Sequence, residues 1–127
     1  MGGLRSRRKG AQYERDLARQ FSAVMPGAEI RRGIQSRTGG DAADVEAPIF
    51  HIEAKRQKKG NPRAALAQAI GDARQGKIPL AVIKDDRQPA FCVLRLDDFL
   101  GFVGEYWQAI NQGGEASDPS TEAIPES

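Results

Sequence analysis

Residues 49–55 of the chain read Ile-Phe-His-Ile-Glu-Ala-Lys, a segment in which apolar and polar side chains alternate. Because side chains on a β-strand point to opposite faces in turn, this period of two predicts a strand with one apolar and one polar face. The apolar face consists of Phe50, Ile52 and Ala54. The polar face consists of His51, Glu53 and Lys55. Such a strand belongs in a sheet whose apolar face is covered, so the neighbouring segments decide the fold.

Helical and strand-like segments follow one another around this strand. Leu17, Phe21 and Val24 recur at helical spacing and predict a helix over about 10–25. Asn61-Pro62 is a good helix start and predicts a second helix to about residue 75. Further strands are expected near 29–34, 44–47, 80–84 and 90–96, and a last helix near 97–110. The order α-β-β-β-α-β-β-α predicts an α/β fold with a central mixed sheet flanked by helices.

Composition suggests how the chain is divided. Residues 1–9 are expected to form a flexible basic arm and residues 10–111 the folded domain. Residues 112–127, rich in Gly, Ser, Pro and Glu, are expected to form a disordered acidic tail. Residues 1–63 hold 14 Lys+Arg and 7 Asp+Glu, whereas residues 64–127 hold 5 and 10. This asymmetry indicates a basic face for a polyanion such as nucleic acid, although a membrane surface or an acidic protein partner also fits the charge.

Cys92 is the only cysteine, so a reducing, cytoplasmic setting is expected. Its apolar neighbours predict a buried core position. No stretch approaches the roughly 18 apolar residues that a membrane span needs. Neither a membrane nor a small-molecule substrate is expected as a partner.

Two carboxylates and a lysine form the candidate site. Asp44 stands nine residues before Glu53, at the start of the neighbouring predicted strand, and a tight connection at Pro48 would bring the two together. Paired carboxylates repel unless a proton or a cation lies between them, and oxygen ligands suit Mg²⁺. Lys55 could orient or help deprotonate an attacking water, or neutralise charge on a phosphate. These groups indicate metal-assisted phosphodiester hydrolysis, although an exposed Glu/Lys pair on an edge strand has the same spacing.

Glu14 lies on the apolar stripe of the first predicted helix, in line with Leu17 and Phe21. A carboxylate at a buried edge needs a positive partner, which could be the adjacent Arg15 or a metal ion. A glutamate near a helix start is also stabilised by the helix dipole, so both interpretations stay open.

Five segments together resemble the PD-(D/E)XK nuclease superfamily. They are Arg-Lys-Gly-Ala-Gln-Tyr-Glu-Arg (8–15), Gly-Asp-Ala-Ala-Asp-Val (40–45), His-Ile-Glu-Ala-Lys (51–55), Lys-Ile-Pro-Leu-Ala-Val-Ile-Lys (77–84) and the apolar run 90–100. Within the superfamily, the chain is most similar to the archaeal-type Holliday junction resolvases and their phage-encoded relatives. The resemblance covers roughly residues 8–103 and implies a restriction-endonuclease-like αβββαβ core.

The resemblance also implies a metal site and its chemistry. Asp44, Glu53 and the main-chain carbonyl of Ala54 would ligate Mg²⁺, for which Mn²⁺ should substitute. Lys55 would assist the nucleophilic water, and Glu14 would complete the acidic site or hold a second metal. The implied activity is cleavage of four-way DNA junctions by a homodimer, leaving 5′-phosphates, in the host cytoplasm if the protein is phage-encoded.

DNA contacts are expected from basic residues around the site. The resemblance implies that Arg15 and Arg31 or Arg32 contact DNA. Phosphate contacts are expected from the other basic residues near the site by their charge: Arg7, Arg8, Lys9, Arg37, Lys58 and Lys59. His51 is expected to be structural or to tune the site, and Gln68 is a minor candidate.

Several assignments remain open. Asp41 competes with Asp44 as the ligand, and Asp44 is preferred because it enters a strand whereas Asp41 follows two glycines. The serine that the related resolvases often carry in this loop corresponds to Ser36, Thr38 or Asp41. Two other functions compete with junction cleavage. One is a PD-(D/E)XK endonuclease acting on linear or nicked duplex in repair or restriction, and the other is a non-catalytic DNA-binding module.

Overall fold

The computed structural model describes residues 3–33, 43–57, 59, 61–74 and 76–112. The chain forms two compact units, Met1–Leu94 and Arg95–Ser127. The folded domain expected over residues 10–111 spans both units, and its bounds stay a prediction. Gln112, which was expected to start the tail, is the last residue of the last helix, and residues 113–127 lie outside the described residues.

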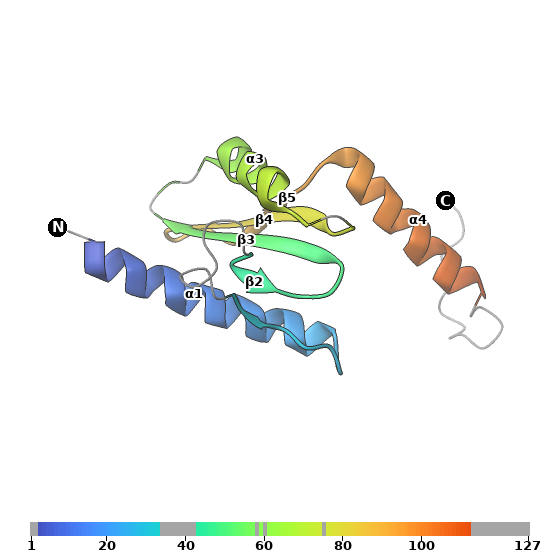
Figure 1. Cartoon of the computed structure of the whole chain (residues 1–127), viewed down its shortest axis with the longest axis horizontal. Helices are drawn as coiled ribbons and strands as arrows, with labels where there is room; N and C mark the ends of the chain where they lie inside the picture. The colour runs from blue at the N-terminus through green and yellow to red at the C-terminus, as the bar shows by residue number, and fades with distance from the viewer. Residues whose placement is uncertain (1–2, 34–42, 58, 60, 75, 113–127) are drawn as a thin grey trace. The chain divides into compact units, whose positions relative to one another are not determined.

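The first unit is built on a five-stranded mixed sheet with the order β1-β2-β3-β4-β5. The strands are β1 (Arg31–Arg32), β2 (Val45–Glu46), β3 (Phe50–Gln57), β4 (Ile78–Asp85) and β5 (Phe91–Val93). β3 and β4 are parallel, and all other neighbours are antiparallel. Helix α1 (Gly3–Val24) covers one face and helix α3 (Pro62–Asp72) the other (Figure 1). The predicted α/β fold and its αβββαβ order are confirmed.

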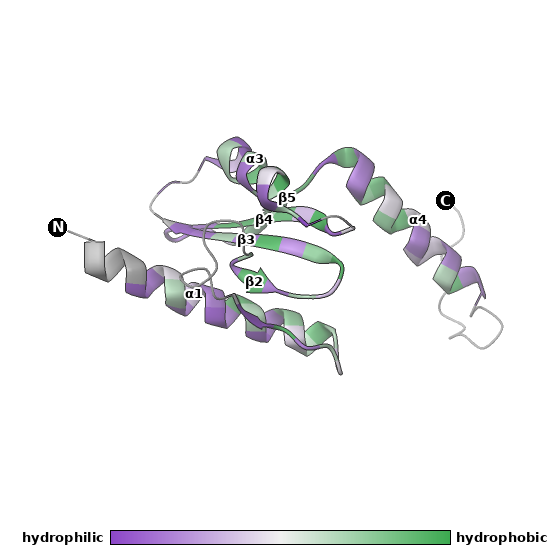
Figure 2. Cartoon of the chain, in the orientation of Figure 1, coloured by the Kyte–Doolittle hydropathy of each residue, from purple (hydrophilic) through white to green (hydrophobic). Residues whose placement is uncertain are grey.

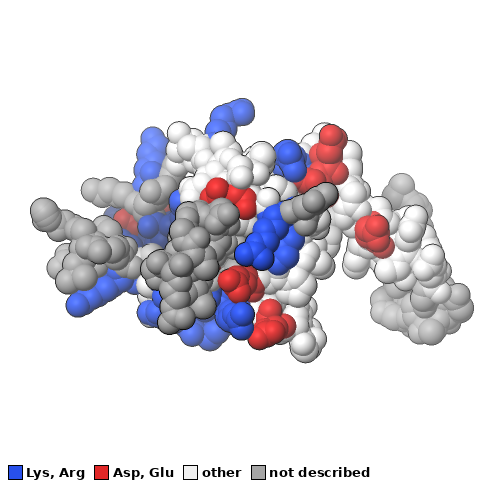
Figure 3. Space-filling model, viewed as in Figure 1, with Lys and Arg blue, Asp and Glu red and all other residues white. Residues whose placement is uncertain are grey.

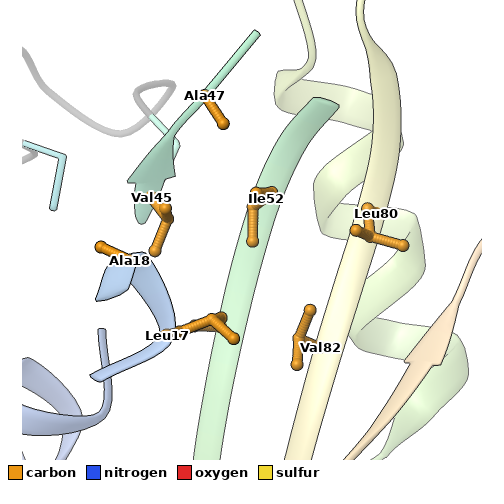
Figure 4. Close-up of a cluster of buried hydrophobic side chains, with 8 residues drawn as sticks. Leu17, Ala18, Val45, Ala47, Ile52, Leu80 and Val82 are labelled. Carbon is orange, nitrogen blue, oxygen red and sulfur yellow. The ribbon is translucent and has the colours of Figure 1, made fainter. Parts of the chain in front are cut away.

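One face of the sheet forms the larger apolar core. Ile52 of β3 packs there with Leu17 of α1, Val45 of β2 and Leu80 of β4 (Figure 4). The other buried members of this cluster are Ala18, Ala47, Ala54 and Val82. The apolar face predicted for β3 is therefore the face that α1 covers. In Figure 2, hydrophobic (green) and hydrophilic (purple) segments alternate along β3, which lies between the two helices.

The second face of β3 is buried as well. The parallel register places Glu53 opposite Ala81, which packs with Ile83 and with Ala65 of α3. Because α3 covers this face, His51 and Glu53 are only 3% and 0% exposed. The polar face predicted from the alternation thus lies inside the protein, where each polar group needs a partner.

Helix α3 begins as predicted. Asn61 is its N-cap, and the side-chain oxygen of Asn61 accepts a hydrogen bond from the main-chain N–H of Ala64 at 3.1 Å. Pro62 occupies the first helical position, where a missing N–H costs nothing. The helix ends at Asp72, slightly before the expected end, and Gly76 follows with a φ of 89°.

Helix α1 begins at Gly3, so the prediction of a flexible arm is wrong for residues 3–9. Arginine and lysine are good helix formers, and this segment contains no proline. Gly10 lies within the helix and weakens it by only about 1 kcal/mol relative to alanine. At its other end the helix stops at Val24, before Pro26-Gly27, where Gly27 takes a φ of 88°.

Cys92 is exposed, so the predicted core position is wrong. It belongs to β5, a three-residue strand at the edge of the sheet, where fewer neighbours are available to cover a side chain.

The second unit contains helix α4 (Leu96–Gln112), which matches the last predicted helix. None of its residues is buried, and its exposed apolar side chains recur at helical spacing. Among the helices that the structure describes, none has the length and hydrophobicity of a bilayer span.

Candidate active site

The short connection between β2 and β3 brings Asp44 beside Glu53. Directly before β2, the main-chain N–H of Asp44 donates to the Ile52 carbonyl of β3 at 2.9 Å. The main-chain N–H of Ala54 donates to Oδ2 of Asp44 at 2.8 Å. Asp44 and Glu53 lie close enough for the charge of Glu53 to act on the carboxyl group of Asp44. The juxtaposition predicted from the sequence is therefore present.

A strained turn fixes this register. The N–H of Phe50 donates to the carbonyl of Pro48 at 2.8 Å, and Ile49 takes a φ of 75°. A β-branched residue rarely adopts this region, and such strain costs on the order of 1–3 kcal/mol. The carbonyl of Ile49 accepts a hydrogen bond from Ile78 at 2.8 Å, which ties the turn to the start of β4. The turn is thus held from both sides, and it sets Asp44 against Ala54.

Burial and mutual repulsion shift the acids of the site. Burial and the neighbouring charge of Glu53 raise the pKa of Asp44 to about 6. Burial also raises the pKa of Glu53. Oε1 of Glu53 is buried and lacks a hydrogen-bond partner within the described part of the chain. Two ionised carboxylates here would be acceptors facing each other, so the pair needs a proton or a cation.

The other oxygen of Glu53 has a partner. Nε2 of His51 lies 3.0 Å from Oε2 of Glu53, and both side chains are buried. Burial lowers the pKa of His51, which favours the neutral imidazole. His51 therefore contacts the site directly, in keeping with its expected structural or tuning role.

Lys55 continues the same face of β3 beyond Glu53. Its ammonium group donates to Oε1 of Gln68, on α3, at 2.9 Å. The amide orients the lysine at the exposed end of the site. The structure places Gln68, a minor candidate from the sequence, beside Lys55, and its role stays a prediction. The signal for it was its place on the helix that must cover the polar face of β3.

Glu14 is paired with Arg32, not with the adjacent Arg15 as considered above. Nε of Arg32 lies 2.7 Å from Oε1 of Glu14, whereas Arg15 donates to Gln12. The pair joins α1 to β1, which are distant in sequence. Burial, and to a lesser extent the charge of Asp44, raise the pKa of Glu14, so Glu14 belongs to the same electrostatic cluster.

Gly33 was missed by the sequence reasoning. It follows β1, and its N–H donates to the main-chain carbonyl of Asp44 at 2.8 Å. A β-carbon at this position would lie 1.8 Å from the main-chain oxygen of Ala43. Only glycine permits such an approach, and a glycine within a strand pattern is the signal that could have shown it.

The oxygen atoms of the site suit a hard cation such as Mg²⁺. Asp44 and Glu53 supply carboxylates, and the Ala54 carbonyl projects to the same side of β3 as its N–H, toward Asp44. Among the described residues, no three His, Cys, Asp or Glu side chains are grouped so as to hold a metal ion. Mg²⁺ commonly keeps waters and binds phosphate oxygens, so two carboxylates and a carbonyl fit it. Glu14 as a further ligand stays a prediction, as does the choice of Asp44 over Asp41, because Asp41 lies outside the described residues.

Three of the predicted DNA-binding side chains already pair with acids. Arg31 pairs with Glu29 at 2.9 Å and with Glu46 at 3.3 Å, Arg32 pairs with Glu14, and Lys9 pairs with Asp86 at 3.6 Å. Figure 3 shows acidic side chains interspersed with basic ones on the face in view. All described members of the set are exposed: Arg8, Lys9, Arg15, Arg31, Arg32 and Lys59. The side chains of Arg7, Arg37 and Lys58 lie outside the described residues.

A mixed sheet with a parallel β3–β4 pair, with Glu53 and Lys55 on β3 and Asp44 just before the adjacent β2, is the arrangement of a PD-(D/E)XK nuclease. The chain belongs to the family described as "Phage putative PDDEXK endonuclease", whose sequence model matches residues 5–106. No curated protein matches the chain. The superfamily and the phage relationship that the sequence motifs indicate are confirmed.

Proposed function

We propose that the protein is a Mg²⁺-dependent endonuclease that cuts branched DNA, in particular the four-way Holliday junction, in the host cytoplasm. The observation that carries the proposal is the buried pair Asp44 and Glu53 with Lys55 beside it on β3. Burying two acids together is costly unless a cation or proton compensates. A module that only binds DNA would gain nothing from acids that face phosphate.

The chain's own residues have distinct roles in this proposal. Bound Mg²⁺ would supply positive charge that stabilises the charge developing on the cleaved phosphate. Asp44, Glu53 and the Ala54 carbonyl would hold it. Lys55 uses one of its three N–H groups on Gln68, and the others can donate to the attacking water or to a phosphate oxygen. Water attacks phosphorus and the P–O3′ bond breaks, leaving a 5′-phosphate and a 3′-hydroxyl.

Affinity for DNA would come from the basic residues around the site. Arg8, Arg15 and Lys59 are exposed and can contact phosphates without conformational change. Arg31 and Arg32 can do so after exchanging their carboxylate partners for phosphate. Such contacts give little sequence preference, which fits recognition of a DNA shape.

We also propose that the active form is a homodimer, since a four-way junction presents two equivalent cleavage sites. Helix α4 offers a surface for a second copy. Its exposed apolar side chains are Leu96, Phe99, Leu100, Phe102, Val103, Tyr106 and Trp107. With aromatic residues burying roughly 150–250 Å² each, this face can bury on the order of 800 Å², the usual contribution of one partner to a stable interface.

The test uses a labelled four-way junction and a linear duplex of the same sequence, with Mg²⁺, with Mn²⁺ and with chelator. We expect cleavage of the junction in either metal, none in chelator, and none by Asp44→Ala or Glu53→Ala. Glu105→Ala, which removes an exposed acid from α4, is the matched control and should cut normally. Junction binding should survive in all variants, because the basic residues are separate from the acids.

The outcomes separate the candidate functions. A junction left intact by the wild type in both metals refutes the enzyme. Full activity of Asp44→Ala or Glu53→Ala refutes the site. Equal cleavage of junction and linear duplex refutes branch selectivity and leaves a nuclease for linear or nicked duplex.

A further inference from the structure

His51 and Glu53 lie two residues apart on the face of β3 that α3 covers, and both side chains are buried. The strand register encloses His51 on either side, opposite Glu46 of β2 and Pro79 of β4. Nε2 of His51 lies 3.0 Å from Oε2 of Glu53. A carboxylate that ligates a cation is ionised and only accepts hydrogen bonds, so in that state Nε2 carries the hydrogen and donates it.

This bond gives the two oxygens of Glu53 different environments. Oε2 is held by the imidazole, whereas Oε1 is buried without a partner in the described part of the chain. A buried acceptor without a donor is unfavourable, so Oε1 calls for a positively charged group. A carboxylate free to rotate would exchange the two oxygens, and the imidazole prevents this.

The same arrangement occurs at Asp44. There the main-chain N–H of Ala54 holds Oδ2 at 2.8 Å. Each acid of the pair is thus fixed through one oxygen by an N–H group of β3. For Asp44 the donor is main chain and cannot be removed by substitution, whereas for Glu53 it is the side chain of residue 51.

We propose that His51 is a positioning residue for Glu53: its Nε2–H holds Oε2 so that Oε1 is presented to the divalent cation. This inference rests on the proposed function and deepens it by naming the residue that orients one ligand. Donors that orient metal ligands in this way typically change metal affinity by about 10- to 100-fold when removed.

A purely structural role makes a different prediction. If His51 only fills space between β2 and β4, its replacement lowers stability but leaves the metal affinity of the folded protein unchanged. The two roles are separated by side chains that differ in whether they can place an N–H near Oε2. Glutamine has the reach to place its amide N–H there, asparagine is too short, and leucine has no donor.

The experiment measures Mn²⁺ binding by isothermal titration calorimetry, with folding checked by circular dichroism, in the wild type and in His51→Leu, His51→Asn and His51→Gln. We expect affinity to fall about 10- to 100-fold for leucine and asparagine and to stay within a few-fold of the wild type for glutamine. Cleavage should follow: the leucine and asparagine variants need more Mn²⁺ for half-maximal rate but approach the wild-type rate at saturation. Val82→Ala, which opens the core on the opposite face of the sheet, controls for general destabilisation and should leave affinity unchanged.

Each outcome supports or refutes the positioning role of His51. Wild-type affinity in a folded leucine or asparagine variant overturns the positioning role, as does equal loss in the glutamine and asparagine variants. If leucine does not fold, the comparison of asparagine with glutamine still gives the answer. Failure of the wild type to bind Mn²⁺ is a separate result, because it contradicts the proposed function itself.

Discussion

At Gly33, the addition of a single methyl group should lower both the cleavage rate and the stability of the protein. It donates its N–H to the carbonyl of Asp44 at 2.8 Å, and its α-carbon passes close to the main chain of Ala43. Gly33→Ala would place a methyl group 1.8 Å from the Ala43 oxygen, where contacts under 3.0 Å are essentially never found. The main chain on one side has to move by more than an ångström.

That movement reaches the active site directly. Ala43 is bonded to Asp44, so displacing one moves the carboxylate of the other relative to Ala54 and Glu53. A misplacement of about 1 Å can cost about 100-fold in rate. Overpacking should also lower the free energy of unfolding by about 1–3 kcal/mol.

The assay compares Gly33→Ala with Gly71→Ala in cleavage rate, Mn²⁺ affinity and urea unfolding. Gly71 lies in α3, and a β-carbon there meets nothing within 4 Å. Gly71→Ala should therefore keep full activity and gain about 0.5–1 kcal/mol of stability. If Gly33→Ala cuts DNA and unfolds like the wild type, the argument that this close approach positions Asp44 is refuted.

Further predictions concern pH, the lysine and α4. The pKa of Asp44 is raised to about 6 in the folded protein, so its contribution to stability is present below about pH 4 and is lost as pH rises through 6. In chelator, Asp44→Asn should remove about 2 kcal/mol of this pH dependence, measured by urea unfolding between pH 4 and pH 7. Identical curves for variant and wild type would contradict the raised pKa. Lys55→Met should lower the cleavage rate by about 10²–10⁴-fold without weakening Mn²⁺ binding. Gln68→Leu should lower the cleavage rate by about tenfold. A wild-type cleavage rate in Gln68→Leu would show that the amide does not orient the lysine. Val103→Glu on α4 should yield a monomer in light scattering at concentrations where the wild type and Glu105→Gln are dimers, whereas a wild-type monomer would contradict the proposed interface.

The fold and the pairing of Asp44 with Glu53 could be predicted from the sequence because both depend on local patterns. The alternation of residues 49–55 and the short connection at Pro48 predict a hairpin that sets Asp44 beside Glu53. The capping chemistry of Asn61-Pro62 predicts the start of α3. Each of these features depends on residues close together in the chain.

The rest depends on contacts between distant segments. Arg32 reaches Glu14 across eighteen positions, and Lys55 reaches Gln68 across thirteen. Periodicity places Glu14 on the apolar edge of its helix but cannot say which cation meets it there. The burial of His51 and Glu53 likewise follows from α3 covering the second face of β3, and a single-strand pattern does not contain that information. The length of α1 escaped prediction because the basic residues 1–9 were interpreted as a flexible arm, although arginine and lysine are good helix formers.

The buried acid pair that the proposed activity needs also lowers the stability of the folded protein. In the proposed site, substitutions of Asp44 or Glu53 would end cleavage and also relieve repulsion in the interior, so such inactive variants should fold at least as well as the active protein. A gene whose product cuts DNA is already harmful to a host that overproduces it. Colonies that survive high expression should therefore accumulate changes at these two codons, since such mutants escape toxicity without losing the protein. Sequencing the gene in colonies that survive overexpression should therefore show mutations concentrated at the codons for Asp44 and Glu53.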